Sequence, residues 1–166
     1  MQMTKMSVNE EGDLMNRRVK MILTVLIIAC GFTACWDAEQ NKATATGTKQ
    51  NENSSVVMEL SALSDQLMEI IQTTTVDLEG YDHQALQQLE KQIKDTKDQY
   101  DGIAGVSCFY TGSASQIVET VRIDLQQADL NLLGEKGILN MEDNSENGLS
   151  FAVSKKHLTA LGFSFD

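Results

Sequence analysis

Basic residues are scarce in this chain of 166 residues. It carries 13 Lys and Arg against 24 Asp and Glu, which gives a net charge of −11 at neutral pH. Proteins that bind nucleic acid gather Lys and Arg on one face to contact phosphates, and anionic lipid attracts the same residues. The composition therefore excludes a nucleic-acid partner, and surface charge alone would keep the chain away from an anionic membrane.

The chain also lacks an apolar run of the roughly 20 residues that a membrane-spanning helix needs. Its most apolar stretch, residues 21–34, follows the basic run 17–20 and ends in small residues just before Cys35. This layout is typical of an export signal. Residues 32–35, Phe-Thr-Ala-Cys, resemble the bacterial lipobox, whose cysteine is lipidated before the signal is removed. We therefore expect residues 1–34 to be a lipoprotein signal peptide and Cys35 to be the lipidation site.

The start and the cleavage point of this signal each have an alternative. The first fourteen residues include three acidic ones, whereas export leaders are basic, so translation from Met15 is a second possibility. Cys30 is a second candidate for lipidation. It follows the bulky Ile28 and would leave a shorter apolar segment, so the pattern favours Cys35.

Removal of residues 1–34 would leave nine basic and 21 acidic residues, so attachment to a membrane has to come from acyl chains. Each buried methylene contributes about 0.8 kcal/mol, and two or more chains suffice for stable anchoring. Trp36 would then suit the headgroup region. We expect a protein held at the extracytoplasmic face of the cell membrane by the lipid on Cys35, with an unidentified envelope protein or ligand as its other partner.

Cysteine is rare as well. Once Cys30 is removed and Cys35 is lipidated, Cys108 is the one free thiol, so no disulfide within the chain can form. Stability then has to come from a hydrophobic core.

Two regions are expected after the signal. Residues 37–54 contain nothing larger than Ala to bury, and such a stretch cannot offset an ordering entropy of about 1 to 2 kcal/mol per residue. We therefore expect residues 35–54 to be the lipidated N-terminus and a flexible tether. Residues 55–166 are long enough to form one domain with its own core.

Periodicity predicts that this domain is α+β. The clearest element is a helix over 82–100, with Asp82 as its N-cap, an apolar stripe that includes Leu89 and Ile93, and a charged outer face. Residues 55–79 fit either a helix or two strands, and a run of threonines together with a turn at 64–66 favours a first hairpin.

Further elements follow the first helix: strands over 106–111 and 116–125, a short helix over 128–133 ended by Gly134, a loop over 140–147, a helix over 151–161 after Ser150, and a terminal strand over 163–165. Together these predict a small two-layer domain in which antiparallel β-hairpins are packed by two or three helices, in the order β-β-α-β-β-α-α-β.

Several local strings accompany this order of elements. They are Tyr-Asp-Gly-Ile-Ala-Gly-Val at 100–106, Val-Arg-Ile-Asp at 121–124, Gly-Leu-Ser-Phe at 148–151 and Leu-Gly-Phe at 161–163. In these features the chain resembles the YehR-like bacterial lipoproteins, a family of unknown function. The resemblance implies a lipid-anchored envelope protein with a small α+β domain that is extended over 56–78. It supplies no catalytic or ligand-binding residues.

Motifs for chemistry are weak. Cys108 lies in the middle of a predicted strand without a histidine nearby in sequence, which favours a buried small side chain over a nucleophile. His83 and His157 lack further ligands at zinc-binding spacing. Residues 143–148 resemble the start of a calcium loop, but Ser154 stands where the bidentate Glu should be. We therefore predict no catalytic residue, no metal site and no cofactor.

The first functional hypothesis is a non-enzymatic binding or interaction module of the cell envelope. The alternatives are a sensor that binds a cation or small ligand on its acidic surface, and a hydrolase whose catalytic residues are dispersed along the chain.

Overall fold

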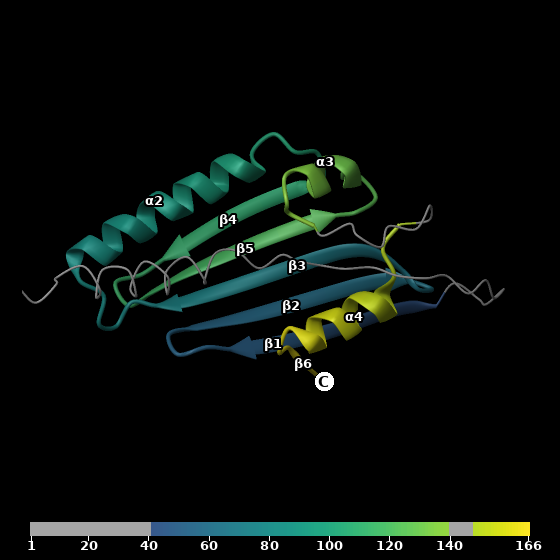
Figure 1. Cartoon of the computed structure of the whole chain (residues 1–166), viewed down its shortest axis with the longest axis horizontal. Coiled ribbons are helices and arrows are strands. Elements are labelled where there is room, and N and C mark those ends of the chain that lie inside the picture. The colour runs from purple at the N-terminus through teal and green to yellow at the C-terminus, as the bar shows by residue number, and fades with distance from the viewer. Residues whose placement is uncertain (1–40, 140–147) are drawn as a thin grey trace, which may run out of the picture.

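The computed structural model describes residues 41–139 and 148–166 of the chain. These form one antiparallel sheet of six strands, in the order β4-β5-β3-β2-β1-β6, and three helices (Figure 1). The predicted α+β class is therefore confirmed. In chain order the elements are β1 Lys42–Gln50, β2 Ser54–Leu63, β3 Gln66–Asp77, α2 His83–Tyr100, β4 Val106–Gly112, β5 Gln116–Asp124, α3 Leu130–Glu135, α4 Phe151–Ala160 and β6 Ser164–Phe165.

The first strand corrects the predicted tether. Residues 42–50 lie inside the range 35–54 that we expected to be flexible, yet they form β1, which pairs along its whole length with β2. The reason is that this position in the sheet has space only for small side chains. Ala45 is buried, and a Cβ added to Gly47 would lie only 2.7 Å from the ring of Phe165. The domain therefore begins near residue 42 and has one more strand than predicted.

The first predicted hairpin is confirmed. β2 and β3 pair as antiparallel strands, and Ser64 in the turn between them has a positive φ of 56°. The Thr-rich end of β3, which favoured a strand over a helix, pairs with β2 on one side and with β5 on the other. Burial alternates along both strands of the hairpin, as expected for a sheet with one face against the core.

The helices begin where side chains cap them. The carboxylate of Asp82 accepts a hydrogen bond of 2.8 Å from the backbone N–H of Ala85, and Ser150 caps α4 in the same way through Val153. The short helix α3 differs slightly from its predicted range. Asp129 accepts from two backbone N–H groups and is its N-cap, so the helix begins at Leu130 and includes Gly134.

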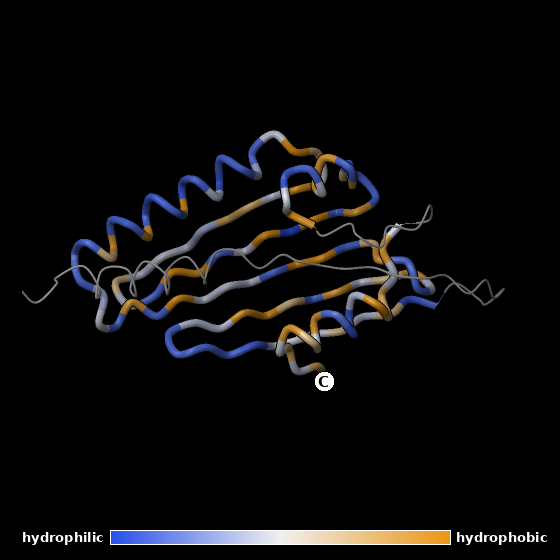
Figure 2. Tube along the Cα trace, viewed as in Figure 1, coloured by the Kyte–Doolittle hydropathy of each residue, from blue (hydrophilic) through white to orange (hydrophobic). Residues whose placement is uncertain are grey.

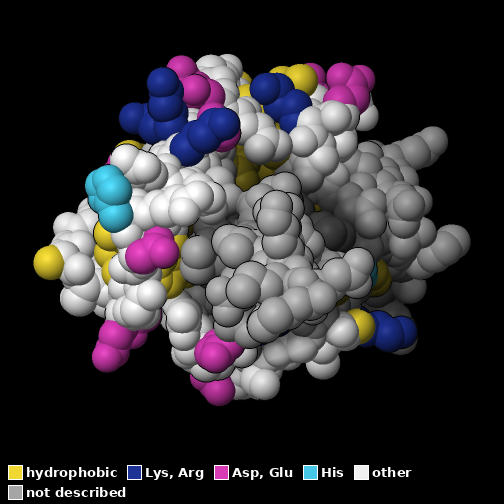
Figure 3. All heavy atoms as spheres, turned by 60° about the vertical axis from the view of Figure 1, so that its left-hand side comes forward, with side chains coloured by type: hydrophobic (Ala, Val, Ile, Leu, Met, Phe, Trp, Pro, Cys, Tyr) yellow, Lys and Arg dark blue, Asp and Glu magenta, His cyan; other side chains and the backbone are white. Residues whose placement is uncertain are grey.

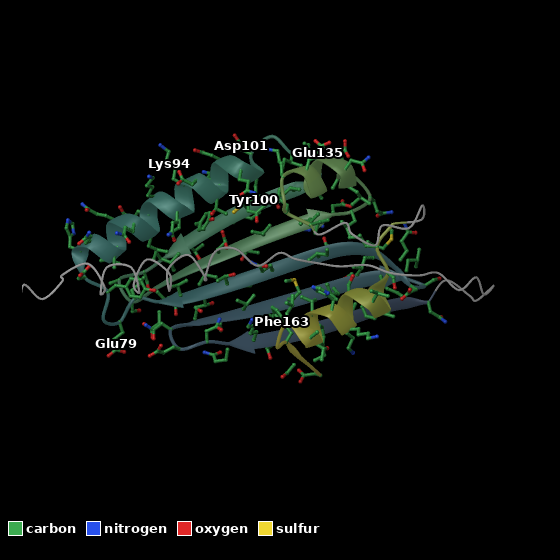
Figure 4. The ribbon with its side chains drawn as sticks, viewed as in Figure 1. Glu79, Lys94, Tyr100, Asp101, Glu135 and Phe163 are labelled. Atoms are coloured by element: carbon green, nitrogen blue, oxygen red, sulfur yellow. The ribbon has the colours of Figure 1, made fainter. Side chains whose placement is uncertain are left out.

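The outer side of α2 is charged and solvated, as predicted. Its charged residues are exposed, and Lys94, Asp101 and Glu135 point away from the sheet in Figure 4. Figure 3 shows basic and acidic side chains close together along the top of the molecule, where α2 and α3 lie. None of the helices in the described residues is long and apolar enough to cross a membrane.

All three helices pack on one face of the sheet, which we call the inner face. Figure 2 shows the apolar residues alternating along the strands, whereas α2 is mostly hydrophilic. Two apolar clusters hold the layers together. The smaller one joins Leu89 of α2 to Val76 of β3, and the larger one includes Met58, Leu60, Ile70, Ile123, Leu133, Leu139, Leu149 and Leu158.

The opposite face, the outer face, is covered by none of the three helices. There the guanidinium of Arg122 on β5 pairs with the carboxylate of Glu69 on β3, and both side chains are partly exposed. Arg122 lies between Val121 and Ile123, which are buried on the inner face, so side-chain alternation along β5 places it on the outer face.

Candidate functional site

The inner face is not apolar throughout. Three neighbouring strands each contribute polar groups to it: Gln72 and Thr74 from β3, Glu119 from β5, and Cys108 and Tyr110 from β4. We call these five residues the polar strip. Thr74 lies opposite Glu119, and Glu119 lies opposite Tyr110, so these three form a row across the strands.

Register explains why these residues meet. Side chains alternate between the two faces of a strand, so residues 117, 119, 121 and 123 of β5 share the inner face. Three of the four are apolar, and Val121 and Ile123 are among the most deeply buried side chains of the protein. Glu119 occupies the fourth position of the set. The same alternation that buries Val121 and Ile123 therefore places the side chain of Glu119 in the interior.

Three residues of the polar strip are buried as deeply as the apolar core, whereas Cys108 and Tyr110 are partly buried. Only 4% of Glu119, 5% of Gln72 and 1% of Thr74 is exposed. A carboxylate is seldom buried to this extent, because it loses the hydration that stabilises its charge. The polar groups of the strip therefore depend on one another for hydrogen bonds.

Two hydrogen bonds are made within the strip. The hydroxyl of Tyr110 donates to Oε1 of Glu119, and Nε2 of Gln72 donates to Oγ1 of Thr74 over 3.2 Å. Oε1 of Gln72 is buried, and it has no hydrogen-bond partner among the described residues. An unpaired buried acceptor of this kind costs about 1 to 3 kcal/mol.

Burial shifts the titration of these groups. It raises the pKa of the Glu119 carboxyl above its ordinary value, and the hydrogen bond from Tyr110 opposes this shift only in part. Burial likewise raises the pKa of Tyr110, and the neighbouring Glu119 raises it further. Burial, followed by Glu119, also raises the pKa of Tyr100, which lies at the end of α2 next to β4 (Figure 4). Tyr100 and Tyr110 therefore both stay protonated at neutral pH.

Cys108 is not activated as a nucleophile. Burial raises the pKa of its thiol, and Glu119 adds to the shift, whereas a hydrogen bond with Tyr110 and the charge of Lys97 lower it only partly. A thiol needs a lowered pKa to attack at neutral pH. This half-buried position on β4 agrees with the interpretation of Cys108 as a small packed side chain.

The other candidate residues lie apart from the strip. His83 is exposed at the start of α2 beside Gln87, and His157 lies on α4. The described ranges contain no group of three or more His, Cys, Asp or Glu side chains that could hold a metal ion. Cys35 and most of the calcium-like loop 143–148 fall outside the described residues.

Sequence reasoning missed the polar strip. The available signal was the alternation of inward and outward side chains along β5. It places Glu119 on the same side as Ile117 and Val121, where a strand normally carries an apolar residue. Gln72 and Thr74 gave no such signal, because amide and hydroxyl side chains are common on either face of a strand.

Comparisons with known proteins identify the family. The model of a family described as proteins of unknown function, DUF1307, matches residues 43–164, which is most of the chain. The chain belongs to this family. The match begins one residue after the start of β1, which supports the corrected domain boundary. No curated protein sequence matches the chain.

Two solved structures share the fold of this DUF1307 protein. The NMR structure of the YehR protein of Escherichia coli has a TM-score of 0.63 at 17% identity, over 77% of this chain and 93% of that one. The NMR structure of a protein from Streptococcus pneumoniae TIGR4 has a TM-score of 0.54 at 13% identity, over 82% of this chain and 92% of that one. These likenesses confirm the YehR-like fold expected from the sequence.

Proposed function

We propose that this protein is a lipid-anchored, extracytoplasmic binding protein that has no catalytic activity. The binding role rests on one observation, the polar strip, in which buried hydrogen-bonding groups face the interior beside an unpaired acceptor. Buried polar groups reduce stability, and proteins retain them mainly where they serve a function.

The chemistry of the strip supports binding over hydrolysis. A hydrolase that acts through a side-chain nucleophile needs a neighbouring base to activate it or a lowered pKa. Around Glu119 the opposite holds, since the pKa values of Cys108, Tyr100 and Tyr110 are all raised. Neither histidine is among the groups that shift the pKa of Cys108. These groups can accept or donate hydrogen bonds at neutral pH, and they are poorly suited to attack a substrate.

The membrane anchor follows from the signal before Cys35. Only six residues separate Cys35 from Lys42, where β1 begins, and six residues span at most about 20 Å when fully extended. A lipid on Cys35 would therefore hold the domain close to the membrane surface, on a shorter connection than we expected from the sequence.

Intact mass spectrometry of the full-length chain, produced in a bacterium and extracted with detergent, tests the anchor. We expect a mature chain that begins at Cys35 and carries acyl groups. The variant Cys35→Ser should lose the acyl groups and leave the membrane fraction, whereas the control Cys30→Ser should be lipidated normally. An unmodified thiol at Cys35 with the preceding residues intact would refute the proposal.

A further inference from the structure

A polar cavity of about 300 Å³ lies at one end of the sheet, where the β1–β2 turn, the end of β3 and the β4–β5 turn meet (Figure 1). The nine described residues that line it are all polar. Two are acidic, three carry amides, four carry hydroxyls, and none is Lys, Arg or His. The volume is at the lower end of the range for small-molecule sites, most of which are lined by apolar side chains. This lining therefore favours a small and hydrophilic ligand.

Strand register places side chains from four neighbouring strands along one side of the cavity. Ser55 on β2 and Thr75 on β3 lie opposite each other, and each stands between two buried residues, so alternation turns both to the outer face. Gln50 on β1 lies opposite Ser55. Asp77 follows Thr75 by two residues and lies opposite Gln116 on β5. These five polar side chains therefore share the outer face, which none of the helices covers.

Backbone hydrogen bonds hold both turns against the end of β3. The N–H of Asp77 donates to the oxygen of Asn53 over 2.9 Å, and the N–H of Leu78 donates to the oxygen of Ser115 over 2.9 Å. The carboxylate of Asp77 is itself oriented, because its Oδ1 accepts from the N–H of Glu79 over 2.9 Å. A cavity whose walls are held in this way loses little conformational freedom when a ligand binds.

Hydrogen-bonding capacity remains inside the cavity. Oδ2 of Asp77 and the side chains of Gln50, Ser55, Thr75 and Gln116 make no hydrogen bond with another described residue. Hydroxyl and amide groups donate and accept, whereas a carboxylate only accepts. A ligand that complements this set carries several hydroxyl groups and at least one strong donor.

Charge decides the nature of that donor. Glu52 and Asp77 are both in the lining, and an anionic ligand would meet them without a basic residue in contact. Lys49 is adjacent to Gln50 in the sequence, but its ammonium donates to the backbone oxygen of Leu161 over 2.9 Å. A positively charged donor is therefore favoured, because a hydrogen bond from a cation to a carboxylate is about twice as strong as a neutral one.

We propose that this cavity binds an amino sugar of a single ring, whose ammonium group pairs with Asp77 and whose hydroxyl groups bond to the amides and hydroxyls of the outer face. A sugar hydroxyl both donates and accepts, as the side chains of Ser55, Thr75 and Gln116 do. The assignment adds a site to the proposed binding role. It does not depend on the polar strip, which lies on the inner face.

NMR titration of the full-length chain tests the assignment, in a detergent without a sugar head group and at about pH 6, where the amino group of the probe is protonated. The probes are glucosamine, glucose and cyclohexylamine. Glucose lacks the charge of glucosamine, and cyclohexylamine lacks its hydroxyl groups. We expect glucosamine to bind about tenfold more tightly than either, and to shift the amide signals of both turns and of the end of β3. Equal affinities, or the absence of glucosamine binding, would overturn the assignment.

Three variants sharpen this test. Asp77→Asn keeps the shape and removes the charge, so it should weaken glucosamine about tenfold and leave glucose unchanged. Thr75→Val removes a hydroxyl and should weaken both sugars without affecting cyclohexylamine. The control Glu59→Gln removes a charge on the same outer face, four residues along β2 from Ser55, and should have no effect.

Thermal melting of each variant shows that it is folded before titration. If Asp77→Asn does not fold, Glu52→Gln removes the other carboxylate of the lining and takes its place in the test. Glucosamine affinity that survives the loss of either carboxylate in a folded variant would refute the site. Such a failure would leave the lipid anchor untouched, because mass spectrometry tests the anchor separately.

Discussion

The inner face of the sheet carries two kinds of surface on the same strands. In one row, Leu60, Ile70 and Ile123 lie side by side on β2, β3 and β5 and are almost completely buried. Four residues further along β3, the row of Thr74 and Glu119 is buried almost as deeply. Burial therefore stabilises the folded state at the apolar row and destabilises it at the polar row. Removing apolar surface from water is favourable, whereas removing a carboxylate from water is not.

The difference separates stability from function. The apolar row belongs to the larger cluster, which α3 and α4 share through Leu133 and Leu158. The polar row is held by hydrogen bonds, one of which comes from Gln72, whose Oε1 is left unpaired. We infer that the apolar row carries the free energy of folding, whereas the polar row is retained for the binding role proposed above.

The largest expected effect comes from the apolar row. Ile70→Ala should lower the free energy of unfolding by about 2 to 5 kcal/mol, because it leaves a cavity in a fully buried site. Urea denaturation measures this loss. The control Ile71→Ala changes the adjacent residue on the partly exposed outer face and should cost less than half as much. Equal losses at both positions would show that the inner face does not carry the stability.

A smaller effect is expected from the polar row. Tyr110→Phe removes the donor to Glu119 and should cost about 1 to 3 kcal/mol, because a buried acceptor then loses its partner. Urea denaturation of a double-mutant cycle with Glu119→Gln measures the coupling between the two side chains. An additive double variant would mean that the hydrogen bond contributes nothing to stability.

The smallest effect is a change in pH dependence at Glu119. Its folded pKa lies above the ordinary 4.5, so in the window that begins near pH 4.5 the native state keeps a proton that the unfolded state has released. The wild-type chain should therefore lose stability as the pH rises through this window, up to the raised pKa. Glu119→Gln cannot titrate, so its stability relative to wild type should increase over the same window.

Urea denaturation at a series of pH values between 4 and 8 measures this change. Glu59→Gln is the matched control, because Glu59 lies on the exposed outer face. If Glu119→Gln and wild type changed in parallel across the series, Glu119 would not bind its proton more tightly in the folded state than in the unfolded state.

Most of the elements follow from local patterns. The helix after Asp82, the hairpin turn at Ser64 and the paired strands β4 and β5 were all predicted, because a cap, a turn and a period of two act over a few neighbouring residues. β1 was missed for the converse reason. Its small residues give no local sign of burial, and Phe165, the ring that packs closely against Gly47, lies more than a hundred residues away.

The polar strip, like β1, could not be predicted from local sequence patterns alone. The phase of β5 predicts that Glu119 points inward, but its partner Tyr110 and the unpaired Gln72 come from two other strands. Only the strand order places β3 and β4 on either side of β5. The residues of the site therefore become recognisable as a group once the sheet is assembled.

The sequence by itself determined the α+β class, the helix and strand ranges that depend on local periodicity, and the family to which the chain belongs. The tertiary structure alone decided the order of the strands, the inclusion of β1 and the meeting of Gln72, Tyr110 and Glu119 on one face. The physical reason is that caps, turns and alternation are short-range. Strand pairing, in contrast, joins residues far apart in the chain, and it is pairing that determines which buried side chains become neighbours.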